Sequence, residues 1–89
     1  MKLDVKKVKI KDDEFTVNEI TMKDMMPIMP RLTGSPEEQQ TAQVDMMNLS
    51  ITLEGEPVDV LQLGVRAYIK LSRAVMAVNG LSDIEGGKD

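Results

Sequence analysis

Cysteine, histidine and tryptophan are all missing from this chain of 89 residues. Without cysteine the protein has no disulfide bond and no thiol nucleophile, and without cysteine and histidine it lacks the usual ligands of zinc. The lack of histidine also excludes a serine–histidine–aspartate relay. No glycine-rich motif for cradling a phosphate is present either. We therefore expect a protein that is not an enzyme and that carries no cofactor or metal ion.

Aromatic residues and long apolar runs are also scarce. Phe15 and Tyr68 are the only aromatic residues, which leaves no platform on which nucleic-acid bases could stack. A net charge of −4 is unfavourable for general nucleic-acid binding. No stretch approaches the roughly 20 apolar residues that span a bilayer, and no signal peptide opens the chain. We expect a protein that binds neither nucleic acid nor membrane and acts in the cytoplasm, that of the host cell if the protein is viral.

The length and the hydrophobic pattern predict one small domain of the α+β class. We expect an N-terminal β-hairpin over residues 6–20, followed by three helices over about 22–32, 36–53 and 58–79. Residues 1–82 make up this domain, and residues 83–89 are expected to form a flexible acidic tail.

The hairpin is predicted by an alternation of apolar and polar residues. Val8 and Ile10 alternate with lysines on the first strand, and Phe15 and Val17 continue the alternation on the second. Asp12-Asp13 supplies the turn. Lysines along one face of a strand keep that face in water and discourage pairing with another sheet edge. Contact with a polyanion is the alternative role for these lysines.

Capping residues mark the helix boundaries. Thr21 is the N-cap of the first helix, and Ser35-Pro36-Glu37-Glu38 forms a capping box with proline in the first helical position. Asp59 is the candidate N-cap of the last helix, which ends at Asn79-Gly80. The segment from Ser50 to Leu53 alternates like a strand, but its continuity with the second helix favours a helix there.

Methionine is abundant, with eight residues in the chain. Four of them, Met22, Met25, Met26 and Met29, fall in the first helix, which Pro27 and Pro30 should kink and shorten. Methionine side chains are flexible and fill irregular cores, but they also form surfaces that accept varied apolar partners. Core packing and an exposed docking surface therefore both remain open for this cluster.

The last helix is apolar over most of its circumference. Its polar residues form one narrow ridge that includes Arg66, Lys70 and Arg73, whereas a surface helix needs an apolar stripe of only somewhat over 100°. A small domain cannot cover so much apolar surface, so we expect a homo-oligomer that forms through this helix. The basic ridge should face residues 36–57, which carry five acidic side chains and no basic one, either in a neighbouring subunit or in the same chain.

These features define a set of candidate partner-binding residues that come from the methionine cluster and the last helix. They are Met22, Met25, Met26, Met29, Leu61, Val65, Arg66, Tyr68, Lys70, Arg73 and Val75.

The order of these features resembles the tail assembly chaperones of long-tailed bacteriophages. The resemblance covers roughly residues 6–82 and rests on the charged hairpin, the helix start at Ile20-Thr21-Met22-Lys23-Asp24, the acidic middle segment and the long helix after Asp59. Gly87-Lys88 is similar to the pair that some members encode over a ribosomal slippery site. The two prolines in the first helix depart from the pattern of the family and leave the extent of that helix open.

The resemblance implies a non-enzymatic chaperone. Members of the family bind the long, helical tape measure protein, keep it soluble and help the tail tube protein to polymerise around it. A permanent structural component of the virion or tube is one alternative function. A small regulatory protein-interaction module is another.

Overall fold

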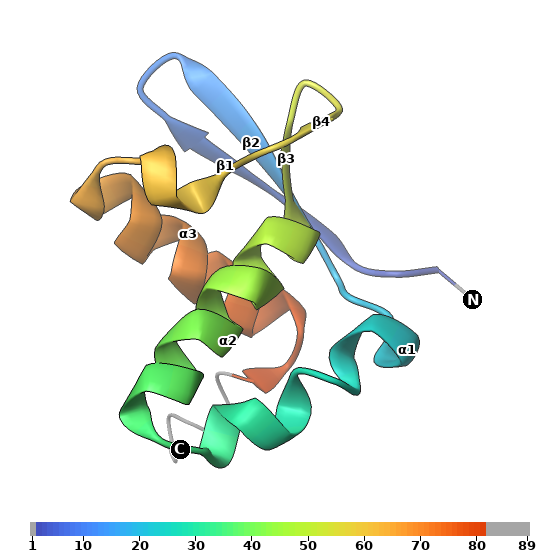
Figure 1. Ribbon diagram of the computed structural model, residues 1–89. Coiled ribbons are helices and arrows are strands. Elements are labelled where there is room, and N and C mark those ends of the chain that lie inside the picture. Colours follow the sequence, from blue (N-terminus) through green and yellow to red (C-terminus); the bar gives the residue numbers. More distant parts are fainter. Residues whose placement is uncertain (1, 82–89) are drawn as a thin grey trace, which may run out of the picture.

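The computed structural model describes residues 2–81, which fold in the predicted α+β class. A four-stranded antiparallel sheet has the order β1-β2-β3-β4, with β1 (Val5–Ile10), β2 (Asp13–Asn18), β3 (Ile51–Leu53) and β4 (Glu56–Pro57). The helices are α1 (Met22–Met25), α2 (Pro36–Ser50) and α3 (Val65–Val78), with 3-10 turns η1 (Met29–Thr33) and η2 (Val60–Gln62) between them (Figure 1). The predicted acidic tail at 83–89 lies outside the described residues.

The N-terminal hairpin is confirmed, with its turn one residue earlier than predicted. Ile10 pairs with Asp13, so the turn consists of Lys11 and Asp12, and Lys11 takes a positive φ of 56°. The pair Val8 and Phe15 lies on the inner face and is buried, as the alternation of the two strands predicts.

The prediction that the second helix continues to residue 53 is wrong. The capping box at Ser35 and Glu38 is present, but α2 ends at Ser50, and Ile51 has extended backbone angles (φ −104°, ψ 131°). Ile51 pairs with Val17, and both side chains are fully buried. Pairing with β2 therefore outweighs continuity with the helix, because a β-branched residue fits a buried strand well.

Glu54 and Gly55 turn the chain back instead of ending a helix. Their φ angles are 53° and 82°, and positive values at both central residues are typical of a type I′ hairpin turn. Leu53 pairs with Glu56 across this turn, which creates the short edge strand β4.

The first predicted helix, over 22–32, is also wrong in extent. The Thr21 hydroxyl accepts a hydrogen bond from the amide of Asp24 (3.3 Å), so the predicted start is correct, but α1 ends at Met25. Pro27 has no amide hydrogen to continue the helix. The chain resumes as η1, which has Pro30 near its start and Gly34 as its C-cap.

The last helix begins later than predicted. The Asp59 carboxylate accepts a hydrogen bond from the amide of Leu61 (3.2 Å) and so caps η2, whereas α3 begins at Val65 after Gly64. The C-terminal end agrees with the prediction, since Asn79 is the C-cap of α3 and Gly80 has a positive φ of 74°.

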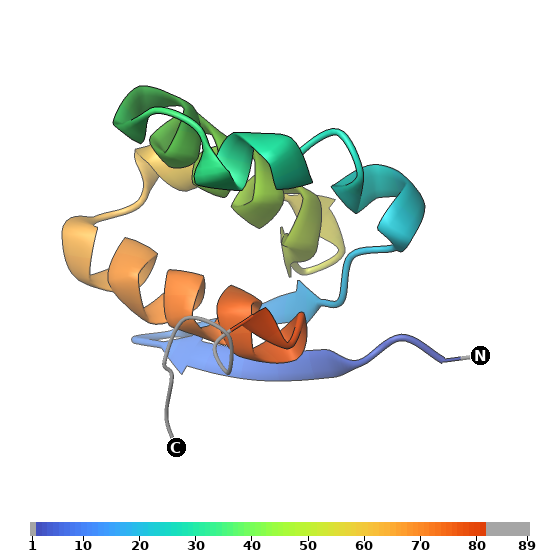
Figure 2. The same ribbon diagram turned by 90° about the horizontal axis from the view of Figure 1, so that it is seen from below.

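The core lies where α3 crosses the hairpin. Figure 2 shows α3 lying along β1 and β2, with α2 and η1 on its opposite side. The largest apolar side chains with less than 2% exposure are Met46 and Met47 of α2, Leu71 and Val75 of α3, Val17 of β2, Ile51 of β3 and Val60 of η2.

Polar side chains of β2 and α2 tie the layers together. The Asn18 amide donates to the carbonyl of Ser50 (3.1 Å), and the Ser50 hydroxyl donates to the carbonyl of Asn18. The Asn48 side chain accepts from the amide of Val60 (3.0 Å) and so links α2 to η2. Within residues 2–81, every buried side-chain nitrogen and oxygen has a hydrogen-bond partner.

The exchange between Ser50 and Asn18 predicts a stability effect. Ser50→Ala leaves the Asn18 carbonyl without its partner and should lower the free energy of unfolding by about 1–2 kcal/mol. Ser72→Ala is the matched control, because the Ser72 hydroxyl bonds only to Ile69 of its own helix (2.9 Å) and alanine favours helix. Urea unfolding measures both variants, and equal small effects would contradict a special role for Ser50.

Candidate functional site

A groove of about 940 Å³ opens between the α1–η1 segment and the C-terminal half of α3. Five of the eight methionines line it. They are Met22, Met25 and Met29 from the α1–η1 segment, Met46 from α2 and Met76 from α3. We call this site the methionine groove; it has the size and the apolar lining of a ligand-binding cleft.

The methionines differ in how far they reach the surface. Met22 is 62% exposed and Met29 is 48% exposed, whereas Met25 is only 7% exposed and Met46 only 1%. The buried pair thus forms the floor of the groove, and the exposed pair forms its rim. Because the α1–η1 segment is broken at Pro27, its side chains do not pack in one regular stripe against the core.

One basic residue of the predicted ridge reaches this groove. Arg73 lies on its α3 side, and within residues 2–81 it makes no ion pair. Glu19 also lines the groove, but its carboxylate accepts a hydrogen bond from the amide of Asp4 (2.8 Å). An apolar ligand with a negative charge near Arg73 would match this arrangement.

The other candidate residues lie elsewhere. Met26 is 62% exposed but lies outside the groove lining, and Val75 is fully buried in the core, so it offers no surface to a partner. Tyr68 is half-buried, and desolvation raises the pKa of its hydroxyl because burial disfavours the charged form. Sequence reasoning missed Met46 and Met76, for which the abundance of methionine was the only signal.

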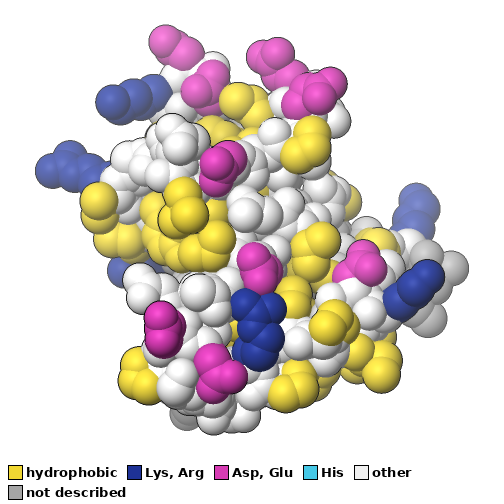
Figure 3. All heavy atoms as spheres, viewed as in Figure 1, with side chains coloured by type: hydrophobic (Ala, Val, Ile, Leu, Met, Phe, Trp, Pro, Cys, Tyr) yellow, Lys and Arg dark blue, Asp and Glu magenta, His cyan; other side chains and the backbone are white. Residues whose placement is uncertain are grey.

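A second apolar surface lies at the opposite end of α3. Leu61, Val65 and Ile69 are exposed by 68%, 75% and 44%, and Val65 and Ile69 share one helix face because they are four residues apart. We call these three residues the α3-start patch. Figure 3 shows hydrophobic side chains gathered over η2 and the start of α3, and others over α1 and η1.

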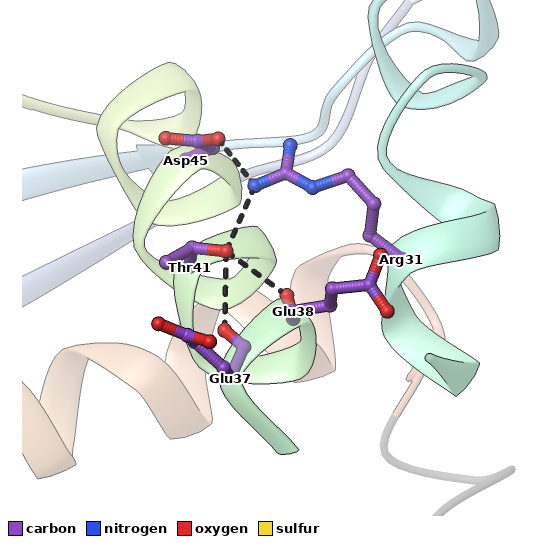
Figure 4. A network of polar contacts seen from close by, with 5 residues as sticks. All are labelled: Arg31, Glu37, Glu38, Thr41 and Asp45. Carbon is purple, nitrogen blue, oxygen red and sulfur yellow. Dashed lines mark hydrogen bonds and ion pairs between the residues drawn. The ribbon is translucent and has the colours of Figure 1, made fainter. Parts of the chain in front are cut away.

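The basic ridge does not pair with the acidic segment of the same chain. In the described part of the chain, the ion pair is between Arg31 and Asp45 (2.9 Å), and Arg31 also donates to the hydroxyl of Thr41 (3.1 Å; Figure 4). Thr41 in turn donates to backbone carbonyls of its own helix. Arg31 comes from η1, where no sequence signal indicated its role. Within residues 2–81, Arg66, Lys70 and Arg73 therefore form no ion pair with the acidic segment 36–57 of the same chain.

Among residues 2–81 no three acidic side chains lie close enough to hold a metal ion, and each described helix is too short or too polar to cross a membrane. Comparisons with protein-family models, curated proteins and solved structures find no match to this chain. The methionine groove is the main candidate site, because it combines an open cavity of about 940 Å³ with a lining that includes five methionines.

The exposures of the methionines predict an order of oxidation. Dilute peroxide should convert Met22, Met26 and Met29 to sulfoxides first, while Met25 and Met46 should react only after unfolding, because oxidation requires access. Mass spectrometry of proteolytic peptides over a time course measures this order. Equal rates for Met22 and Met25 would contradict the described groove.

Proposed function

We propose that this protein is a non-enzymatic tail assembly chaperone that binds an apolar helical face of the tape measure protein in the methionine groove. The observation that carries the proposal is the clustering of five methionines around one open groove. A groove of this kind fits an amphipathic helix, whose apolar residues recur at intervals of three and four.

The methionine lining suits reversible binding of varied sequences. Flexible thioether side chains adapt to ligands of different shape without leaving polar groups unpaired. The α1–η1 rim consists of two very short elements, of four and five residues, and such elements have little helical stability of their own. The rim can thus adjust to a client, while the long helices α2 and α3 hold the other sides.

The identity of the client rests on the resemblance in sequence. This resemblance implies that the ligand is the tape measure protein, that the tail tube protein is a further partner and that the protein acts in the host cytoplasm. A permanent component of the virion or tube is the competing function. A chaperone should be absent from finished particles, whereas a structural component should be present in them. A small regulatory protein-interaction module remains the other alternative, with a client unrelated to tail assembly.

Self-association is the second part of the proposal. The α3-start patch exposes three large apolar side chains together, and patches of this kind mark interaction surfaces. Arg66 and Lys70 follow Val65 and Ile69 along α3, so basic groups border the patch. Contact with exposed acidic residues of α2 in a neighbouring copy, Glu37 and Glu38, would be head-to-tail, which leads to rings or open spirals.

The chaperone proposal predicts a difference between two neighbouring methionines. Met22→Glu places a carboxylate in the groove and should weaken binding to the tape measure protein about tenfold or more. Met26→Glu is the matched control: Met26 has the same 62% exposure as Met22 but does not line the groove. Co-expression with the tape measure protein of the same genome, followed by measurement of its soluble fraction, tests both variants. Equal loss of solubility with both would contradict binding in the groove.

The self-association proposal predicts a change in size without a change in fold. Val65 is 75% exposed, so Val65→Asp should leave the melting temperature of the monomer nearly unchanged while reducing the oligomer to monomers. Sedimentation velocity at high micromolar concentration measures the size, with Met26→Glu as a control for an added charge elsewhere. A strictly monomeric native protein would refute this part of the proposal.

A further inference from the structure

β1 is an edge strand of the sheet, and within residues 2–81 one side of its backbone has no strand partner. The amide of Glu19 donates to the carbonyl of Asp4 (2.8 Å), which places the even-numbered residues of this strand in the hydrogen-bonded pairs with β2. The N–H and C=O groups of Val5, Lys7 and Lys9 therefore point away from β2. Three residues of this edge thus offer backbone donors and acceptors to another chain.

Basic side chains from two distant parts of the sequence surround this edge. A hollow of about 510 Å³ is lined by Lys6, Lys7 and Lys9 of β1 and by Lys70 and Arg73 of α3. Its other lining residues are small or buried apolar ones: Val8, Ala74 and Ala77. Five basic residues therefore line one concave surface of a chain whose net charge is −4. The Lys7 ammonium itself donates to the hydroxyl of Thr16 on β2 (3.0 Å), so Lys7 contributes its backbone to the edge more than its charge to the hollow.

One of these groups already contacts the open edge. The Lys70 ammonium donates to the carbonyl of Lys9 (3.3 Å), across 61 positions of the sequence. This contact agrees with the outward direction of that carbonyl. A strand arriving at the edge would offer an amide to the same carbonyl, and Lys70 would then be free to pair with a carboxylate of the arriving strand.

We propose that β1 and the basic hollow beside it form a second docking site, which binds an extended acidic segment of a partner protein as an added β-strand. Backbone hydrogen bonds to Val5, Lys7 and Lys9 would supply affinity, and the cationic side chains would select a negatively charged sequence. The site shares only Arg73 with the methionine groove, so it does not depend on the proposed function.

Protection of β1 against pairing with another sheet edge does not by itself account for the basic residues around it. Lysines on an edge strand repel another copy of the same edge, but the same charges attract a strand of opposite charge. The opposite edge of the sheet is protected differently, since β4 has only two residues, and one of them is Pro57, which has no amide hydrogen. For that reason, β4 of a second copy is a poor partner for β1, although Glu56 gives it the right charge.

A peptide fits the site better than a nucleic acid. The open edge presents donors and acceptors in alternation, which match a polypeptide backbone, whereas phosphates only accept hydrogen bonds. The two aromatic residues give no stacking surface here, because Phe15 is buried and neither residue lines the hollow.

The test uses a capped, fluorescein-labelled peptide of three alternating glutamate–valine pairs and the full chain at low ionic strength. Binding is measured by fluorescence anisotropy, and NMR locates it. We expect the amide signals of Val5, Lys7 and Lys9 to shift, and the affinity to fall as salt is added, because salt screens exposed charges. A fully N-methylated version of the peptide, which keeps the side chains and lacks every backbone donor, should not bind.

Two charge-reversal variants provide the matched comparison. Lys70→Glu reverses a charge inside the hollow and should weaken peptide binding about tenfold. Lys23→Glu makes the same change at an exposed position of α1, outside the hollow and the groove, and should weaken binding by about twofold at most, because distant charges are screened.

Four results would overturn the proposal. They are equal binding of the N-methylated peptide, equal effects of the two variants, tighter binding of a twelve-residue oligothymidine than of the peptide, and shifts of the β1 amides that depend on protein concentration without any peptide. The last result would assign the edge to a second copy of this chain.

Discussion

The fold depends on the pairing of β3 with β2. Ile51 and Val17 are directly opposite in this pairing, and both are fully buried. The two hydrogen bonds between Ser50 and Asn18 hold the junction where α2 changes into β3. This pairing ends α2 at Ser50 and directs the chain through the turn at Glu54 into β4 and η2. The start of α3, and therefore the position of α3 across the hairpin, follows from that path.

Local signals predicted those parts of the fold that depend on local interactions. The alternation around Val8 identifies the hairpin, and the capping box at Ser35 and Glu38 identifies the start of α2. The segment from Ser50 to Leu53 showed the same kind of alternation, but continuity with the helix before it favoured a helix. Its strand conformation depends on pairing with a strand more than thirty residues away, which local signals do not reveal. Asp59 was correctly identified as a cap, but the element that it caps is a 3-10 turn, which has the same N-terminal signal as a helix.

The sequence indicated which residue types form the candidate sites, but not which residues the fold brings together there. The methionine cluster was visible in the sequence, yet its partners Met46 and Met76 join it only because α2 and α3 fold against the α1–η1 segment. The basic ridge was also visible, but its neighbours on β1 were not, since Lys9 and Lys70 are 61 positions apart. The charges of residues 36–57 favoured a predicted contact with the basic ridge. In the structure, Asp45 of that segment pairs with Arg31 instead.

The two proposed sites differ in the physical interaction that would select a ligand. In the methionine groove, recognition would depend on apolar contact, which is non-directional and tolerates many sequences. At the β1 edge, recognition would depend on backbone hydrogen bonds and charge, which require an extended and acidic segment. A helical ligand has satisfied its backbone groups internally, so it gains nothing from the edge. An extended ligand presents side chains in alternation and not on one helical face, so it fits the groove poorly. If both proposals hold, one small chain can bind two partners, or two segments of one partner, that compete only for Arg73.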